Sequence, residues 1–121
     1  MKNPFSQDLC SPSQIEGIDI EELVSSVLNI NQLETGILFL LFERPYSAVE
    51  LSQHTQKHRS TIQKSLSNLM GKGLIIRKKQ GLRRGYHYTY SSIPKERVKE
   101  LMISYIDEQT NCLKERIYRG L

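Results

Sequence analysis

The side chains best suited to specific polar recognition lie in one short stretch, from Lys57 to Ser67. Arg pairs with guanine and Gln with adenine at base edges, whereas Lys, Ser and Thr more often hold phosphate oxygens. Apolar residues recur through this stretch at helical spacing, which predicts a helix with one packed face and one free polar face. The candidate DNA contacts are Lys57, His58, Arg59, Ser60, Thr61, Gln63, Lys64 and Ser67.

A second basic stretch follows that helix. Leu74, Ile75 and Ile76 lead into basic residues, and Gly81 and Gly85 bracket a predicted hairpin tip. A basic hairpin beside a helix can lie along the DNA backbone or in the minor groove. Its candidate contacts are Arg77, Lys79, Arg83 and Arg84, with Lys78 and His87 along its flanks.

Tyr86, Tyr88 and Tyr90 alternate on the returning strand. The alternation favours packing of all three against the helices over stacking on bases, so we leave them out of the expected site.

The charge is strongly segregated along the chain. Residues 1–40 carry a net charge of −5, residues 41–92 carry +8 and residues 93–121 carry +1. Between Lys57 and Arg84 there are nine Lys or Arg and no Asp or Glu. A charge run is commonly a solvated surface, but the exclusion of acids from a stretch with apolar periodicity favours a folded surface that binds a polyanion.

The length of 121 residues and the 38% hydrophobic content indicate one domain with a real core. No run approaches the roughly 18 to 20 apolar residues of a membrane span, and we expect a cytoplasmic protein. The sequence has no phosphate-binding Gly-rich loop, no cluster of metal ligands and no Ser-His-Asp or Cys-His arrangement. We therefore expect neither an enzyme nor a metal or cofactor site.

The two cysteines, Cys10 and Cys112, stand far apart and without metal-ligand spacing. We expect Cys10 to be an exposed thiol in an N-terminal arm and Cys112 to be a packed small residue. The alternative is that these thiols bridge subunits and alter DNA binding.

Capping signals predict three helices ahead of the polar stretch. The second of these is apolar on almost all sides and ends before Pro45, and the third is short and ends near Thr55. Gly71 and Gly73 supply the stop of the helix that carries the polar stretch. The three capping pairs are Asp19 with Glu22, Asn31 with Glu34, and Ser47 with Glu50.

A final helix of about 25 residues is predicted from near Pro94. Its apolar stripe could cover the core of its own chain, but a helix of this length meets a small domain along only part of its course. We therefore favour a homodimer, with two recognition helices spaced for a pseudo-palindromic DNA site. The expected interface residues are Val98, Leu101, Met102, Tyr105, Ile106, Leu113 and Ile117.

The run from Asn31 to Ser92 resembles a winged helix-turn-helix, and with its flanking helices the chain resembles single-domain TrmB-like and MarR-like transcriptional regulators of archaea and bacteria. The motifs are a short helix of the form S-A-x-E-L-S, a recognition helix R-S-T-x-x-x-x-L-x-x-L-x-x-K-G-L-I, a Y-x-Y pair and a proline-led helix. They match Ser47 to Ser52, Arg59 to Ile75, the alternating tyrosines and Pro94 onward. The chain departs from the pattern at Gln56 and Lys57, where the family usually has Gly and an apolar residue, and at His58, which replaces a Ser cap.

The predicted fold class is mostly α with a small β-hairpin wing, a winged helix-turn-helix with flanking helices. The predicted organisation is an N-terminal arm (1–18), a DNA-binding domain (19–92) and a C-terminal dimerisation helix (93–121). The expected function is regulation of transcription by sequence-specific binding of double-stranded DNA, with no particular effector indicated. The alternatives are a winged helix that binds other proteins and a basic protein that coats DNA without reading bases.

Overall fold

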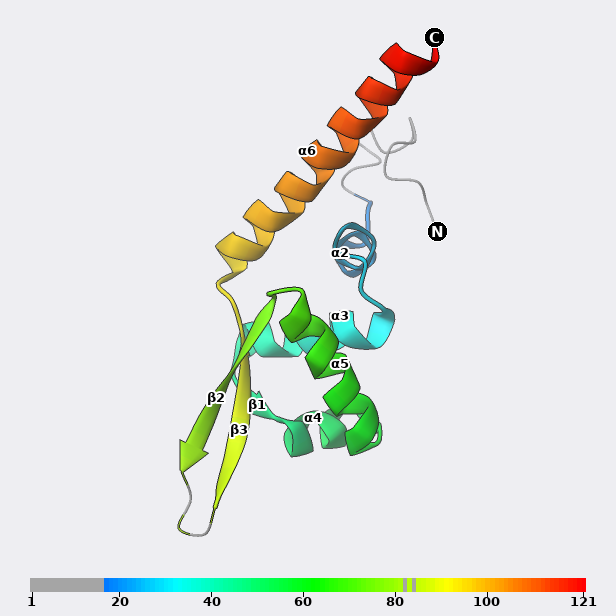
Figure 1. The fold of residues 1–121 in the computed structure, drawn as a ribbon. Coiled ribbons are helices and arrows are strands. Elements are labelled where there is room, and N and C mark those ends of the chain that lie inside the picture. The colour runs from blue at the N-terminus through cyan, green and yellow to red at the C-terminus, as the bar shows by residue number, and fades with distance from the viewer. Residues whose placement is uncertain (1–16, 82, 84) are drawn as a thin grey trace.

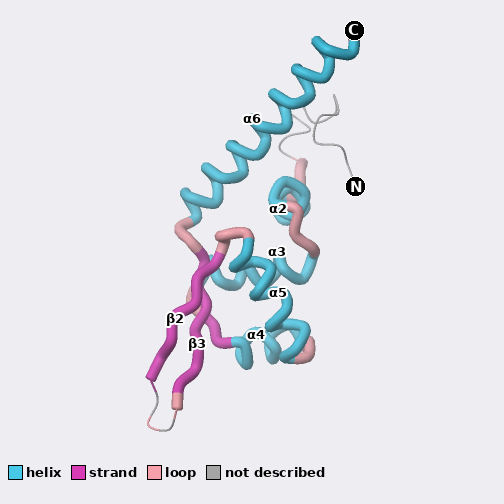
Figure 2. The backbone as a smooth tube through the Cα atoms, viewed as in Figure 1, coloured by secondary structure: helices cyan, strands magenta, loops and turns pink. Residues whose placement is uncertain are grey.

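The computed structural model describes residues 17–81, 83 and 85–121, and it confirms the predicted fold class (Figure 1). A cluster of helices carries a small antiparallel sheet, whose hairpin β2–β3 extends from one end of the molecule. The long helix α6 projects from the other end (Figures 1 and 2). The elements are α2 (Ile20–Leu28), α3 (Gln32–Glu43), β1 (Tyr46–Ser47), α4 (Ala48–Thr55), α5 (Arg59–Gly71), β2 (Ile75–Gly81), β3 (Tyr86–Ser92) and α6 (Lys95–Gly120). The expected arm lies almost entirely outside the described residues.

The helix starts follow the capping signals with two exceptions. The reciprocal capping boxes of Asn31 with Glu34 and Ser47 with Glu50 are both present, as predicted. Asp19 caps α2 by accepting a hydrogen bond from the backbone of Glu21 rather than by a reciprocal pair with Glu22. His58 occupies the N-cap position of α5, but its side chain makes no capping hydrogen bond.

The core forms where α5 packs against α3 and α4. Ile62, Leu66 and Leu69 of α5 are completely buried, as are Ile37 and Leu38 of α3. Each such side chain contributes roughly 1.5–3 kcal/mol to stability. The rotation of α5 about its own axis is therefore fixed by its apolar face.

A buried carboxylate links α3 to the far end of α5. Glu34 is buried, and its Oε1 accepts a hydrogen bond from the backbone N–H of Asn31 at 3.0 Å. Its other oxygen, Oε2, accepts from Nδ2 of Asn68 on α5 at 2.9 Å. The same side chain thus completes a helix cap and holds α5 at a second point.

The sheet contains a strand that the sequence did not predict. β1 pairs antiparallel with β3, so the strand order is β1-β3-β2 and β3 is central. Tyr46 lies opposite Tyr90, and both tyrosines are buried. This short strand ties the hairpin to the start of α4.

The two halves of α6 lie in different environments. Val98 is buried, and Leu101, Met102 and Tyr105 pack partly buried against the core of their own chain. Beyond them, Ile106, Leu113 and Ile117 are exposed. Of the expected dimer contacts, the first four therefore pack within the chain and the last three face away from it.

Among the described residues, no single helix is long and apolar enough to cross a membrane. In this described part of the chain, one pair of helices, α2 and α3, reaches that length and composition when taken together, and the two are bent by 112° relative to each other. The apolar residues Val24, Leu28, Ile37, Leu38 and Leu41 of this pair are buried in the core.

Cys112 is exposed on α6, so the prediction that it packs as a small buried residue is wrong. It lies on the part of α6 that no other described element covers. Cys10 lies outside the described residues.

The turn between α4 and α5 contains a non-glycine residue, Gln56, in the left-handed conformation. Gln56 has φ 56° and ψ 35°, in the region where a side chain is strained by roughly 1–2 kcal/mol. The hydroxyl of Ser52 donates to the carbonyl oxygen of Lys57 at 2.6 Å across this turn. The turn geometry is thus maintained in spite of the departure from Gly.

Gln56→Gly should raise the free energy of unfolding by about 0.5 kcal/mol, because relief of the left-handed strain exceeds the added chain entropy of Gly. Urea denaturation measures the change. Gln53→Gly is the matched control, since Gln53 is an exposed residue within α4. This variant should lose about 1 kcal/mol of the free energy of unfolding. A loss of stability in both variants would contradict the assignment of strain to Gln56.

Candidate nucleic-acid interface

A groove of about 580 Å³ separates the first turns of α5 from the hairpin. Arg59 and Gln63 line it from α5, and Ser47, Ala48 and Val49 line it from the start of α4. The opposite wall is formed by residues of the two wing strands, namely Arg77, Tyr86, His87, Tyr88 and Tyr90. The groove thus brings together candidate residues that are far apart in the sequence.

The polar face of α5 is exposed to solvent. Every candidate contact on this helix is exposed, and the turn residues Lys57 and His58 before it are exposed as well. Ser65 on the same helix is buried, so this polar residue does not belong to the exposed polar face. The exposed candidates are Arg59, Ser60, Thr61, Gln63, Lys64 and Ser67.

The register of the wing divides its basic residues between two faces. Arg77 lies opposite Tyr90 and Lys79 lies opposite Tyr88, so both share a face with the tyrosines. Lys78 lies opposite Thr89, and its side chain belongs to the other face. Arg77 and Lys79 are therefore placed on the tyrosine face of the wing, which borders the groove, and Lys78 is not.

Tyrosine rings support the two basic side chains of that face. The guanidinium carbon of Arg77 lies 4.3 Å from the ring centroid of Tyr88, and Nζ of Lys79 lies 3.9 Å from that of Tyr86. The two rings meet edge to face with their centroids 5.6 Å apart. Cation–π contacts of this kind hold long side chains in place without neutralising their charge.

The prediction that all three tyrosines pack against the helices is wrong for Tyr86. Tyr90 is buried and Tyr88 is partly buried, but Tyr86 is 54% exposed. The wing extends beyond the helices, so its outer residues have no helix to pack on (Figure 2). Tyr86, Tyr88 and His87 line the groove. The sequence signal for this was the alternation of tyrosines on β3 opposite basic residues on β2.

The tip of the wing is described only in part. Arg83 is exposed between the two strands, whereas Arg84 lies outside the described residues.

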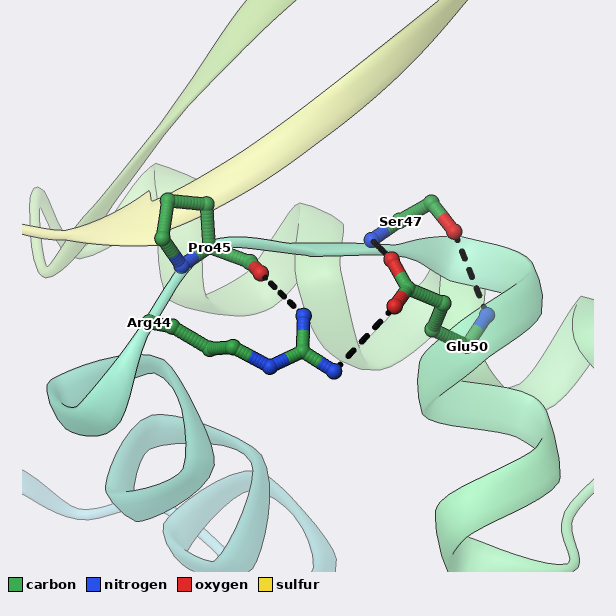
Figure 3. A network of polar contacts seen from close by, with 4 residues as sticks. All are labelled: Arg44, Pro45, Ser47 and Glu50. Atoms are coloured by element: carbon green, nitrogen blue, oxygen red, sulfur yellow. Dashed lines mark hydrogen bonds and ion pairs between the residues drawn. The ribbon is translucent and has the colours of Figure 1, made fainter.

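A polar network braces the start of α4 beside the groove (Figure 3). Nη2 of Arg44 donates to Oε2 of Glu50 at 3.2 Å, and Nη1 donates to the carbonyl oxygen of Pro45 at 2.9 Å. The guanidinium carbon of Arg44 also lies 3.7 Å from the ring centroid of Tyr46. No sequence pattern marks Arg44, because its contacts with Glu50 and Tyr46 depend on how α4 and β1 are placed in the fold.

The carboxylate of Glu50 has an altered acidity. The backbone N–H of Ser47 donates to its Oε1 at 3.0 Å, and this bond is the main cause that lowers the pKa of Glu50 below the ordinary value of 4.5. Desolvation opposes the shift, and the bond and charge of Arg44 add to it. The ionised form of Glu50 is therefore favoured in the folded protein.

The chain matches the family model described as the sugar-specific transcriptional regulator TrmB over residues 24–96. This chain belongs to the TrmB family. The match runs from α2 to the first residues of α6 and includes every described candidate contact for nucleic acid. This TrmB-family protein is thus a DNA-binding transcriptional regulator of the winged helix-turn-helix type.

Two curated relatives come from Methanocaldococcus jannaschii. The uncharacterized protein MJ1082 is 29% identical over 104 residues, which cover 85% of this chain and 87% of the relative. The uncharacterized protein MJ1503 is 29% identical over 97 residues, which cover 78% of this chain and 74% of the relative.

Solved structures share the fold of this TrmB-family chain. A possible transcriptional regulator from Methanosarcina mazei has a TM-score of 0.76 at 20% identity, covering 84% of this chain and 88% of that one. The transcriptional regulator BldR from Sulfolobus solfataricus has a TM-score of 0.54 at 23% identity, covering 88% and 76%.

The free energy of unfolding of this TrmB-family protein should fall as the pH drops through the lowered pKa of Glu50. A carboxyl group with a lowered pKa in the folded state adds stability above its unfolded pKa and loses it on protonation. Glu50→Gln should therefore flatten the pH dependence of stability as the pH falls below the ordinary carboxyl pKa of 4.5, as measured by urea denaturation at a series of pH values. Glu43→Gln, an exposed carboxylate of α3, is the control, and an equal flattening in both variants would contradict the role of the network.

Proposed function

We propose that this TrmB-family protein binds specific sequences of double-stranded DNA as a homodimer, with α5 in the major groove and the wing on the backbone or in the minor groove. The observation that carries the proposal is the groove between α5 and the wing. Arg59 and Gln63 line it from α5 and Arg77 lines it from the wing, and its described lining residues include no Asp or Glu. The dimension of an α-helix suits the major groove of B-DNA.

The residues in and just before α5 fall into two groups, one suited to base contacts and one to phosphate contacts. Arg59 and Gln63 carry planar groups that can pair bidentately with guanine and adenine. Both lie in the first turns of α5, where recognition helices reach base edges. Lys57, His58, Ser60, Thr61, Lys64 and Ser67 have short or flexible donors suited to phosphate oxygens around them.

The wing would supply contacts that do not depend on sequence. Arg77 and Lys79 are exposed and supported by tyrosine rings on the same face of the hairpin. Arg83 and Arg84, which follow in the sequence, would add two further positive charges to these contacts. Neutralisation of phosphates by such side chains releases counterions and makes binding depend steeply on salt.

We assign DNA binding to residues 19–92 and dimerisation to residues 93–121. The exposed apolar residues Ile106, Leu113 and Ile117 of α6 support this division, since single-chain packing leaves them in water. Val98, Leu101, Met102 and Tyr105 would act by fixing α6 to its own domain.

The direct test is a selection from random duplex DNA at about 150 mM salt, with scrambled duplex as competitor. Enrichment of a two-fold symmetric motif would support specific binding by a dimer. A folded protein that enriches no motif would overturn the proposal in favour of a protein-interaction module or a DNA-coating protein.

Arg59→Ala and Gln63→Ala should each weaken binding to the selected duplex by about 1–3 kcal/mol and weaken binding to scrambled duplex much less. The reason is that bidentate base contacts exist only on the correct sequence. Fluorescence anisotropy at fixed salt measures both affinities. Equal losses on the two duplexes would remove these side chains from base readout.

Arg77→Ala should weaken binding to all duplexes and reduce the salt slope of log K by about 1, because one phosphate contact is lost. Lys78→Ala is the matched control, since it removes the same charge from the opposite face of the same strand. Titrations between about 50 and 200 mM salt give the slopes. Identical slopes for the two variants would show that the wing attracts DNA only through its total charge.

A further inference from the structure

The outer part of α6 carries a second apolar stripe that no described element covers. Four apolar residues, Ile103, Ile106, Leu113 and Ile117, follow one another together with Thr110 at alternating steps of three and four residues. This spacing is the heptad pattern of a coiled-coil seam. The hydroxyl of Thr110 donates to the carbonyl oxygen of Ile106 at 2.8 Å. We call these five residues the α6 seam.

The α6 seam is distinct from the stripe that holds α6 to its domain. That inner stripe consists of Val98, Leu101, Met102 and Tyr105. In the seam, Ile103 and Ile117 are 60% and 59% exposed. Of the ten large apolar side chains that are exposed in the described part of the chain, six lie between residues 103 and 121.

We propose that the α6 seams of two copies pair in an antiparallel coiled coil, centred between Asn111 and Cys112. This inference rests on the homodimer of the proposed function and adds to it the direction and register of the pair. The occupant of the seam is thus a second copy of this chain.

The apolar layers fit this register. Thr110 lies opposite Leu113 of the partner subunit, and Ile106 lies opposite Ile117 of the partner subunit. Each layer occurs twice because of the two-fold axis, so four layers form the centre. Ile103 then meets Gly120 of the partner subunit, where the seam ends.

Charges beside the seam select the antiparallel direction. Side chains that flank a seam pair across the interface and set partner orientation. In the proposed register, Asp107 approaches Lys114 of the partner subunit twice, and Gln109 approaches Arg116 of the partner subunit twice. Neither Asp107 nor Lys114 forms an ion pair within the described part of its own chain.

The competing arrangements lack this complementarity. A parallel pair would place Asp107 beside Met102 and Lys114 beside Gln109 of the partner subunit, with no ion pair. An antiparallel pair shifted by one heptad would bring either two Asp107 or two Lys114 side chains together. Like charges at such positions oppose association.

Disulfide trapping tests the register directly. In a chain with Cys10→Ser and Cys112→Ser, the single variants Ile106→Cys and Ile117→Cys are expressed separately and together with different tags. The antiparallel register predicts oxidation to a cross-linked dimer of the two tagged chains when they are coexpressed, with little cross-linking of either variant alone. In this register two copies of residue 106, or of residue 117, are offset along the coiled coil by about 16 Å, beyond the Cα separation of about 7 Å that a disulfide tolerates.

The possible results are distinguishable. Efficient cross-linking of each variant with itself would overturn the antiparallel direction while leaving the dimer of the proposed function intact. A dimer that cross-links in neither experiment would overturn the seam as its interface. A monomer at all concentrations by light scattering would overturn both the pairing and the dimer, whereas DNA binding is tested separately by the duplex selection.

A charge exchange provides a second test without cysteines. Asp107→Lys should weaken the dimer about tenfold in sedimentation equilibrium, because two attractive pairs become repulsive. Adding Lys114→Asp to this variant should restore the dimer. Glu108→Lys is the control, since its position points away from the seam, and an equal loss in the control or no rescue would overturn the register.

Discussion

The burial of one face of α5 is the constraint on which the rest of the structure depends. Ile62, Leu66 and Leu69 lose all contact with water between α3 and α4. That packing leaves no freedom in the rotation of α5, so Arg59 and Gln63 must face outward beside the wing. The hydrogen bond from Asn68 to the buried Glu34 fixes the far end of the same helix. The core beneath α5 thus sets which way its polar face points.

Most of the fold could be predicted because local signals and tertiary packing agree. The capping boxes at Asn31 and Ser47 mark helix starts that the structure confirms, and the apolar periodicity of α5 selects the face that is buried. Strand β1 could not be predicted, because two residues carry no periodicity and pair only when β3 lies beside them. The turn at Gln56 likewise depends on its surroundings, since the residue does not favour a left-handed conformation.

The candidate site was less completely predictable, because a list of basic residues does not say which way they point. Alternation along the strand separates Arg77 and Lys79 from Lys78, but the pairing of these two residues with the tyrosine face depends on the register between β2 and β3. The exposure of Tyr86 follows from the length of the hairpin beyond the helices, and the exposure of Cys112 from the length of α6 beyond its domain. Both errors have the same cause, namely that periodicity predicts a shared face but not the presence of a neighbour to cover it.

The continuity of α6 has a mechanical consequence. Its first turns are anchored to the core through Val98, and the helix runs without a break from Lys95 to Gly120. A helix of that length is a stiff rod of roughly 39 Å, in which a tilt of about 5° at one end moves the other by about 3 Å. A change of angle imposed on the outer end of α6 therefore acts as a lever on the anchored domain. Such a displacement is comparable to one base-pair step along DNA, so leverage on this rod would alter how the α5 surface meets a duplex.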